Sequence, residues 1–410
     1  MKQPAALTPN VDSSFDCSIA YLLMFEDKLR ALEERHVLRR LRVIDSAPGP
    51  TVTIAGRPVI LMASNDYLGL ATHPALKQAA IEATERFGVG SGASRLISGT
   101  LSPHNELERT LADFKQTESA LVFGSGYLAN IGLIPTLVDA TGLILADRLS
   151  HASLIDGSRL SGAEFRVFRH GDMRQLQGLL DRRSTGREIL IVTEGIFSMD
   201  GDAAPLVEMA DLAERYGARL LVDDAHGTGV MGRTGRGTLE HCGVESRIPF
   251  HMGTLSKAFG TSGAYVVGPT GLIQYLINRA RPLMFSTAPP PATAAAAAAA
   301  IQVLRSEPQR LARLWNNQRY FVERLRALKF DLAPTVSPIV PVMIGSAEKT
   351  EVFAKRLLEL GVYAPAIRPP TVPKNTSRIR ATVTAEHTRE QLDQVLAAFA
   401  TAGGELGIAP

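Results

Sequence analysis

The chain has 410 residues, which is enough for two or three domains with hydrophobic cores of their own. Its 45% hydrophobic and 21% charged residues are ordinary for a globular protein, and a net charge of +3 is too small to indicate nucleic-acid binding. The sequence lacks an apolar run of about 18 residues, as a membrane span requires, and its N-terminus lacks the basic start and apolar core of a signal peptide. We therefore expect a cytoplasmic protein with two unpaired thiols, Cys17 and Cys242, and no bound metal.

The N-terminal part is predicted to contain one helix. Residues 25–43 carry acidic and basic side chains at three- and four-residue spacing, which is typical of a helix, whereas residues 1–24 show no strong period. The basic end of this segment, Arg39, Arg40 and Arg42, is most simply a solvated face that stabilises a helix C-terminus. Contact with an anionic substrate is the alternative interpretation.

Short apolar segments alternate with helical segments from about residue 60 to residue 290. This alternation predicts a mainly parallel sheet covered by helices on both faces, with ligands beyond the C-terminal ends of the strands. Asp223 and the loop 194–200 fall at such ends, and 206–216 is a clear helical segment. The strand candidates are 120–126, 142–148, 164–170, 187–195, 218–226 and 263–269.

The C-terminal part is expected to form a smaller α/β domain. A long helix should follow the prolines near residue 289 and continue beyond Arg313. After it, strands are predicted at 339–345 and 377–384, and helices at 349–361 and 388–403. The expected organisation is an N-terminal segment with its helix (1–60), a large domain (61–290), and a linking helix with a small domain (291–410).

Lys257 and Asp223 indicate the chemistry. Lys257 lies between Ser256 and Ala258 with little charged company, so its amine can be partly desolvated and nucleophilic. Asp223 ends an apolar run, as a carboxylate at the end of a buried strand would, and it continues the alternation from Leu221, which Asp224 does not. An amine that forms a Schiff base and a carboxylate that keeps a pyridinium protonated are the two groups that a pyridoxal phosphate (PLP) enzyme needs.

The residues Gly124, Ser125 and Gly126 lead from a predicted strand into a helix start. Backbone N–H groups at such a terminus can bind an anion, although a purely structural turn is an equally simple interpretation. The segment is neither a P-loop nor a dinucleotide-binding motif, because both spacings are absent.

Other polar side chains lie in loops near these positions, and each has an ordinary structural alternative such as a turn hydrogen bond or a surface position. Two histidines could contact a planar ring, and hydroxyl groups could contact a phosphate or the cofactor's phenolic oxygen. Arg368 precedes two prolines that fix the chain, and its planar guanidinium suits a substrate carboxylate. The candidates are His151, Ser198, His226, Thr254, Ser256, Arg368 and Thr371.

With these residues assembled, the chain strongly resembles the α-oxoamine synthases, PLP enzymes of fold type I, from about residue 25 to residue 400. The resemblance implies a large domain with a mainly parallel sheet between helices and a smaller C-terminal α/β domain. The motifs that carry it are SNDYLGL (64–70), GVGSGASRLISGT (88–100), HNELE (104–108), DRLSHASL (147–154), TEGIFSMDGD (193–202), VDDAHGTG (222–229), GTLSKAFG (253–260) and FSTAPPP (285–291).

The resemblance also implies roles for individual residues. Lys257 would form the Schiff base with PLP, Asp223 would pair with the pyridine nitrogen, and His151 would stack on the ring. The remaining cofactor contacts would come from Gly126, Tyr127, Ser198, His226 and Thr254, and from Ser286 and Thr287 toward the neighbour's phosphate in a homodimer with shared sites. Substrate contacts would come from Arg39, Asn65, His151 and Thr371, with Arg368 as the carboxylate clamp.

Within the family, the run 367–380 is most similar to the branch that condenses L-alanine with a pimeloyl thioester, carried by CoA or by an acyl carrier protein. The expected products are an amino-oxo acid, CO2 and the thiol. The first alternative is condensation of glycine with acetyl-CoA. A non-catalytic partner subunit is a second, although such subunits typically lack the lysine that stands here at 257. An aldolase-type lyase fits the cofactor but not the motifs.

Overall fold

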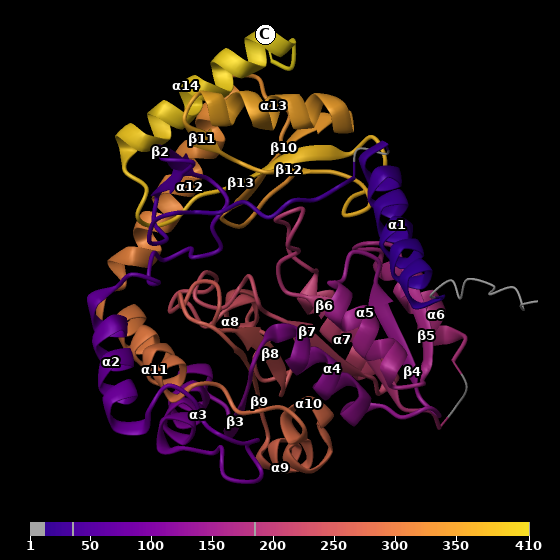
Figure 1. Cartoon of the computed structure of the whole chain (residues 1–410). Coiled ribbons are helices and arrows are strands. Elements are labelled where there is room, and N and C mark those ends of the chain that lie inside the picture. Colours follow the sequence, from indigo (N-terminus) through magenta and orange to yellow (C-terminus); the bar gives the residue numbers. More distant parts are fainter. Residues whose placement is uncertain (1–12, 35–36, 184–185, 410) are drawn as a thin grey trace, which may run out of the picture.

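The computed structural model describes residues 13–34, 37–183 and 186–409, with side chains from residue 24 onward (Figure 1). The strands are β1 (Thr51–Ile54), β2 (Arg57–Leu61), β3 (Ser119–Phe123), β4 (Leu143–Asp147), β5 (Glu164–Phe168), β6 (Ile189–Glu194), β7 (Arg219–Asp223), β8 (His251–Thr254), β9 (Ala264–Gly268), β10 (Ile339–Gly345), β11 (Val362–Tyr363), β12 (Ala366–Ile367) and β13 (Ser377–Thr382). The helices are α1 (Ser13–Glu34), α2 (Pro74–Phe87), α3 (Ser102–Lys115), α4 (Gly126–Leu137), α5 (Ala152–Leu160), α6 (Met173–Asp181), α7 (Leu206–Tyr216), α8 (Thr238–Cys242), α9 (Thr270–Arg279), α10 (Arg281–Met284), α11 (Pro291–Ser306), α12 (Gln309–Ala327), α13 (Ala347–Glu359) and α14 (Arg389–Leu406).

A seven-stranded sheet of order β3-β9-β8-β7-β6-β4-β5 forms the centre of the large part of the molecule. The neighbours from β8 to β5 pair in parallel, and β9 runs against both β8 and β3, so the expected mainly parallel sheet is confirmed. Each of the six predicted strands is present. β8 was not predicted, because its short sequence, His251–Thr254, shows no apolar run.

Helices cover both faces of this sheet, because its strands alternate apolar side chains toward each face. Ile144 and Ala146 of β4 pack on one face with α4, α5 and α9, whereas Leu143 and Leu145 pack on the other with α6, α7 and α8. The polar residues that follow the parallel strands therefore emerge together at one edge of the sheet.

The small part contains the antiparallel sheet β10-β13-β12 and the helices α13 and α14, as predicted for residues 330–410. β1 and β2 also join this part, which was not predicted: β2 pairs in parallel with β11 through Ile60–Val362 and Leu61–Tyr363. Residues 51–61 thus belong to the C-terminal part in space, unlike the predicted segment 1–60.

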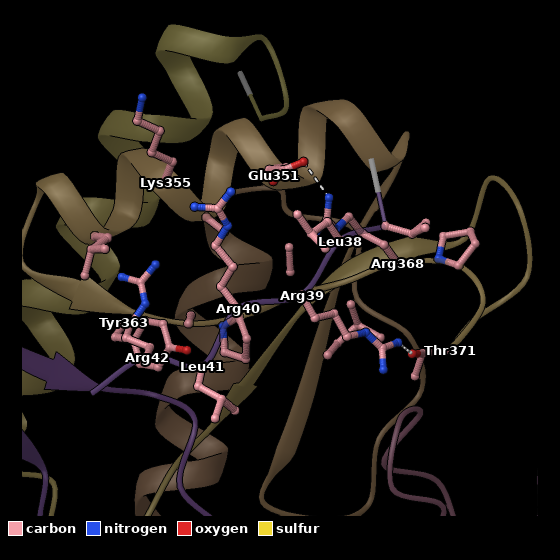
Figure 2. A pocket seen from close by; sticks show the side chains of 18 of the residues that line it. Leu38, Arg39, Arg40, Leu41, Arg42, Glu351, Lys355, Tyr363, Arg368 and Thr371 are labelled. Atoms are coloured by element: carbon pink, nitrogen blue, oxygen red, sulfur yellow. Dashed lines mark hydrogen bonds and ion pairs between the residues drawn. The ribbon is translucent and has the colours of Figure 1, made fainter. Parts of the chain in front are cut away.

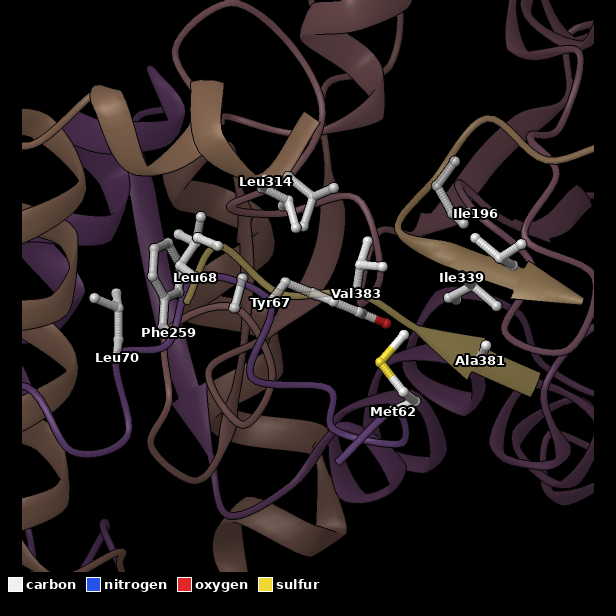
Figure 3. Packing of buried hydrophobic residues seen from close by; sticks show 14 of the residues in the cluster. Met62, Tyr67, Leu68, Leu70, Ile196, Phe259, Leu314, Ile339, Ala381 and Val383 are labelled. Atoms are coloured by element: carbon white, nitrogen blue, oxygen red, sulfur yellow. The ribbon is translucent and has the colours of Figure 1, made fainter. Parts of the chain in front are cut away.

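The two parts share one hydrophobic core (Figure 3). Met62, Tyr67 and Leu68 run between them and pack with residues of both, including Phe259, Ile339 and Val383. Backbone bonds from Thr382 N to Met62 O (2.9 Å) and from Ala385 N to Tyr67 O (2.8 Å) fix this crossing segment. The site at the sheet edge therefore lies beside a packed junction of the two parts.

The prediction of a helix over 25–43 was wrong in its extent. α1 ends at Glu34, residues 35–36 lie outside the described part, and 37–45 contain no helix. The charged periodicity of this segment has no buried apolar stripe behind it, and Leu41 is fully exposed. Arg39, Arg40 and Arg42 consequently extend from an irregular segment and not from a helix end.

The long helix predicted after residue 289 is two helices. α11 ends at Ser306 and α12 begins at Gln309. Pro308 lacks a backbone N–H and its ring clashes with the preceding turn, so it interrupts the helix and starts the next one. In the described part of the chain, no helix is long and apolar enough to cross a membrane. Cys242 is a free thiol, and the side chain of Cys17 lies outside the described residues.

Candidate active site

Asp223 stands at the C-terminal end of β7, between the ends of β6 and β8. Its side chain is 6% exposed and accepts hydrogen bonds from Asn130 Nδ2 (2.7 Å) and from the backbone N–H of Ala225 (3.0 Å). These donors hold the carboxylate in one orientation. Asn130 lies on α4 and was not singled out from the sequence, although it follows Gly126 of the predicted helix start by only four residues.

Lys257 follows β8 in a tight turn, where Gly260 N bonds to Lys257 O at 2.8 Å. Burial lowers the pKa of the Lys257 amine, and the nearby charge of Asp223 opposes this shift without cancelling it. An amine with a lowered pKa is deprotonated, and so nucleophilic, in a larger fraction of molecules. Lys257 therefore lies close enough to Asp223 for the carboxylate charge to affect its pKa, and their joint role toward one cofactor stays a prediction.

Glu194, at the end of β6 beside Asp223, is a further carboxyl group that the sequence did not reveal as part of the site. Burial, and then the charge of Asp223, raise the pKa of Glu194 well above its usual range. The nearby backbone N–H groups of His151 and Ser198 oppose this shift without cancelling it, and the buried Oε1 atom has no hydrogen-bond partner among the described residues. We infer that Glu194 is neutral.

Asp224 has a structural position, as the choice of Asp223 from the sequence implied. It is fully buried, accepts hydrogen bonds from Thr228 and Thr238, and forms an ion pair with Lys115 Nζ at 3.5 Å. Its carboxylate thus joins α3 and α8 to the sheet.

The N-terminus of α4 offers an anion-binding position. Ser125 caps the helix by accepting a bond from Leu128 N (3.2 Å), and the N–H groups of Gly126 and Tyr127 begin the first turn. A Cβ atom at Gly126 would lie 2.8 Å from Thr254 Cγ2, so a glycine is needed for the helix to approach the end of β8. The Tyr127 side chain is exposed and donates to Asp156 Oδ2 (2.6 Å), which leaves only its backbone for this position.

The two candidate histidines differ in their surroundings. His151 is exposed and caps α5, and its Nδ1 lies 2.7 Å from Ser153 Oγ, which in turn accepts from Asn130 Nδ2 (2.9 Å). A chain of hydrogen bonds therefore links His151 to Asp223 through Asn130. An exposed ring held in this way can cover a planar cofactor, as predicted.

His226 is buried, and its Nδ1 lies 2.6 Å from Tyr67 Oη. Burial, followed by the charges of Lys257 and Arg380, lowers the pKa of His226 well below its usual range, whereas burial raises the pKa of Tyr67. Both groups are thus neutral near pH 7 and share one hydrogen bond. Tyr67 Oη also lies 3.4 Å from Asn65 Oδ1, which brings the predicted Asn65 into the same group.

Arg380 on β13 lies beside Asn65, Tyr67 and His226, and it was not singled out from the sequence. It donates to Ser198 O through Nε (2.6 Å) and to Asn65 Oδ1 through Nη2 (3.3 Å), and its charge contributes to the lowered pKa of Lys257. Arg368, which the sequence favoured as the carboxylate clamp, forms an ion pair with Glu351 of α13. The two prolines after Arg368 do fix the chain there, but they place its side chain in a groove at the periphery of the site.

That groove, of about 970 Å³, is lined by three of the predicted substrate residues, Arg39, Arg368 and Thr371 (Figure 2). Arg39 Nη2 donates to Thr371 Oγ1 at 3.0 Å, so these residues, 332 positions apart, do meet. Ser286 and Thr287 follow α10, where Thr287 pairs with Ser94. Among the described residues, the hydrogen bonds of the Lys257 group do not involve Ser286 or Thr287, and their role in a neighbour's site stays a prediction.

His170 holds the loop that carries Ser198. Its ring nitrogens lie 3.0 Å from Asp147 Oδ1 and 2.8 Å from Asp202 Oδ2, and the ring packs edge-on against Phe197. The hydrogen bonds to the two carboxylates raise the pKa of His170 from 6.5 to about 10. The folded protein therefore keeps a proton here that the unfolded chain releases.

The raised pKa of His170 predicts that the free energy of unfolding depends on pH. The contribution of His170 should be complete below pH 6.5 and be lost as the pH rises toward about 10, because only the unfolded chain releases the proton in that range. The melting temperature of the wild type should thus fall more steeply between pH 7 and pH 10 than that of His170→Gln, measured by circular dichroism. Equal slopes would contradict the assignment.

The residues assembled here fit PLP. They provide a nucleophilic amine, a fixed buried carboxylate, an exposed imidazole and a helix N-terminus beside Thr254, all at the strand ends where ligands bind in such sheets. Arg368, Ser286 and Thr287 are not among these groups.

The chain belongs to the aminotransferase class I and II family, which matches residues 57–399. Among curated proteins, it is 49% identical over 384 residues to the 8-amino-7-oxononanoate synthase of Symbiobacterium thermophilum, covering 93% of this chain and 98% of that one. It is 48% identical over 392 residues to the same enzyme of Thermoanaerobacter pseudethanolicus, covering 95% and 99% of the two chains.

Two solved structures extend the comparison. A serine palmitoyltransferase from S. paucimobilis, with PLP and myriocin bound, superimposes with a TM-score of 0.89 and 36% identity over 98% of this chain and all of that one. An 8-amino-7-oxononanoate synthase from Francisella tularensis gives a TM-score of 0.74 and 29% identity over 85% and 98% of the chains. Both confirm the α/β fold predicted from the sequence.

Proposed function

We propose that this protein is a PLP-dependent acyltransferase that condenses L-alanine with a pimeloyl thioester, giving 8-amino-7-oxononanoate, CO2 and the thiol, as a step of biotin biosynthesis. The observation that carries the proposal is the Lys257–Asp223 pair, set at the ends of β8 and β7 with Asn130 fixing the carboxylate. The near full-length similarity to curated 8-amino-7-oxononanoate synthases supports the choice of substrates.

Each group of the site has a distinct task. PLP, when bound, supplies an aldehyde that bonds amines and a protonated pyridine ring that accepts an electron pair. Lys257 would bond that aldehyde, and Asp223 would keep the ring nitrogen protonated. The first turn of α4 and the Thr254 hydroxyl would bind the phosphate, and His151 would cover the ring. His226 and Ser198 would contact the phenolic oxygen.

Lys257 is also the group that moves protons. When it is not bonded to the cofactor, the Lys257 amine would lie beside the substrate's α-carbon, and its lowered pKa would suit it to accept a proton there near pH 7. The resulting ammonium would be in place to return that proton to the same carbon. His226 and Tyr67 are both neutral, so they do not compete for this proton.

We assign the alanine carboxylate to Arg380 in place of Arg368. Arg380 reaches Asn65 and the Ser198 loop, and a guanidinium can bind a carboxylate through two parallel hydrogen bonds. Arg380→Lys retains the charge and loses that geometry. The KM for L-alanine should rise by about tenfold or more, a loss of roughly 1.4 kcal/mol. An equal increase for Arg368→Lys, measured in parallel, would instead favour the original assignment.

We further propose that the protein acts as a homodimer with shared sites. Val89, Ile97 and Phe285 are large apolar side chains with exposed fractions of 82%, 81% and 69%, and Phe285 directly precedes Ser286 and Thr287. A second copy of the chain would bury these apolar side chains. Ser286 and Thr287 of each copy would then reach the cofactor phosphate in the other copy's site. The cytoplasmic location stays a prediction.

A substrate panel tests the reaction. Purified protein with PLP is incubated with L-alanine or glycine and with pimeloyl-CoA or acetyl-CoA, and the products are identified by mass spectrometry. The proposal predicts that alanine with pimeloyl-CoA gives the highest kcat/KM. A preference for glycine with acetyl-CoA would establish the alternative reaction, and inactivity with all four pairs would favour a non-catalytic partner subunit.

A further inference from the structure

The motif 104–108 lies outside the group of residues around Lys257, and two of its side chains are buried polar groups. His104 and Glu108 both lie on α3, beside the edge strand β3 of the large sheet (Figure 1). His104 has no exposed surface, and 14% of the Glu108 side chain is exposed. Buried polar side chains have defined hydrogen-bond partners, and the partners of these two include the segments 88–100 and 285–291.

His104 holds the segment 285–291 through one ring nitrogen. The backbone N–H of Leu101 donates to His104 Nδ1 at 3.0 Å, so Nδ1 is unprotonated and Nε2 carries the hydrogen. Nε2 then donates to Pro289 O at 2.8 Å. Burial lowers the pKa of His104, which keeps the ring neutral and in this tautomer. The Pro289 carbonyl is therefore held by a ring that is itself fixed at both nitrogens.

A second donor reaches the same carbonyl from the segment 88–100. Ser91 is 8% exposed, and its Oγ donates to Pro289 O at 2.6 Å. A carbonyl oxygen has two acceptor positions, so Ser91 and His104 together occupy both. The position of Pro289 is thus determined by one side chain from a loop and one from a helix.

The segments 88–100 and 285–291 are also joined through their backbones. Ala288 N donates to Ala93 O at 2.9 Å, and Thr287 forms an antiparallel bridge with Ser94. Pro289 follows Thr287 by two residues. The bonds to its carbonyl therefore fix this short ladder next to the residues that carry the hydroxyl groups.

Glu108 fixes the segment 88–100 to the same helix. Nη1 and Nη2 of Arg95 donate to the two carboxylate oxygens of Glu108 at 2.8 and 3.0 Å, and Val122 N of β3 donates to Oε1 at 2.9 Å. A guanidinium that binds a carboxylate at two points fixes orientation as well as distance. Both sides of the ladder are therefore anchored on α3, one through His104 and one through Glu108.

The residues next to these buried anchors are exposed. Thr287 is exposed, and so are the apolar side chains of Val89, Ile97 and Phe285, which lie on the same two segments. The ladder is thus fixed from within its own chain and is available to a second one. This is the arrangement expected of a segment that is presented to another copy in a defined position.

We propose that His104 is a positioning residue for the cofactor site of the partner subunit. Its bond to Pro289 O sets the position of the Ser286 and Thr287 hydroxyl groups, which bind the phosphate of the PLP in the second copy. The inference rests on the homodimer and the PLP site proposed above. It gives the motif 104–108 a role in the site of the neighbouring chain and not in that of its own.

The first test compares the affinities of the cofactor-free protein for PLP and for pyridoxal, which lacks the phosphate. His104→Asn keeps an acceptor near Nδ1 for Leu101 N and removes the donor to Pro289, whereas His104→Gln places an N–H group near Nε2 and keeps that donor. Leu107→Ala, at a fully buried position three residues further along α3, is the control for packing lost in this helix. Circular dichroism verifies that each variant is folded.

His104→Asn should raise the Kd for PLP by about tenfold, as expected for the loss of one hydrogen bond to a charged group, and should leave the Kd for pyridoxal unchanged. His104→Gln should bind PLP nearly as the wild type does. Leu107→Ala should have a lower melting temperature and wild-type affinity for both compounds. A histidine that only stabilises the fold would weaken both compounds equally or neither, and either result would overturn the proposal.

Mixed dimers with a different affinity tag on each chain test the direction of the effect. One chain carries Lys257→Ala, so borohydride can attach PLP only to the chain that retains Lys257. His104→Asn on the chain without Lys257 should raise the PLP concentration needed for half-maximal attachment by about tenfold. On the chain that retains Lys257 it should have no effect. The reverse pattern, or a wild type that sediments as a monomer, would contradict the proposal.

These outcomes are independent of the proposed reaction, because PLP binding requires neither alanine nor a thioester. An effect of His104→Asn across the dimer, in a protein that forms no product from any substrate pair, would refute the reaction and leave the role of His104 intact. Normal product formation with an unchanged PLP affinity of His104→Asn would refute the role and support the reaction.

Discussion

Replacement of Lys257 by alanine should reduce kcat by about 10³-fold or more, because one side chain both bonds the cofactor and moves the substrate proton. The variant should still bind PLP, since Asp223, the α4 N-terminus and His151 remain. The measurement is the rate of thiol release, together with the visible absorbance of the protein. Reduction by borohydride should attach PLP to Lys257 of the wild type only.

Lys77→Ala, at an exposed position on α2, is the control for a lysine lost elsewhere and should retain full activity. If Lys257→Ala kept the turnover of the wild type, or if borohydride fixed PLP to another lysine, Lys257 would not be the reactive amine. The whole assignment of the site would then be wrong.

Asp223→Asn should reduce kcat by about 10²-fold or more at nearly unchanged stability, since the amide is the size of the carboxylate but cannot keep the ring nitrogen protonated. Its oxygen can still accept the bond from Asn130, now 2.7 Å from the carboxylate. Steady-state kinetics with L-alanine and pimeloyl-CoA, at saturating PLP, measure this loss.

The adjacent residue provides the comparison. Asp224→Asn leaves the buried Lys115 without its counter-charge, and breaking such a pair costs about 3–5 kcal/mol. This variant should have a clearly lower melting temperature but a near-normal kcat at low temperature. The opposite pattern, with activity lost at Asp224 and retained at Asp223, would exchange the roles of the two carboxylates.

Much of the fold was predictable, because the strands of the large sheet are buried on both faces and therefore appear as apolar runs. The same runs placed Asp223 at a strand end, whereas Lys257 was singled out from its immediate neighbours and not from the strand before it. β8 and the short strands β11 and β12 were missed, since pairing with distant neighbours and not local composition defines them.

The site was predictable only where a residue has a local signature. Tyr67 and Arg380 lie in segments quoted above, and Asn130 lies four residues after Gly126, but all three contact partners far along the chain. For example, 159 positions separate Tyr67 from His226, and 93 separate Asn130 from Asp223. Arg368 had the stronger local signal in its two prolines, yet the antiparallel register of β13 brings Arg380, and not Arg368, to the Ser198 loop. Contacts of this kind depend on the folded topology.

Release of the carboxyl carbon of alanine tests the central claim most directly. L-alanine labelled with ¹³C at the carboxyl carbon is incubated with pimeloyl-CoA, PLP and the protein, while labelled CO2 and the CoA thiol are measured together. We predict one labelled CO2 for each thiol, with an unlabelled amino-oxo acid as the product. Thiol release without labelled CO2 would show thioester hydrolysis, and that result would contradict the decarboxylative condensation.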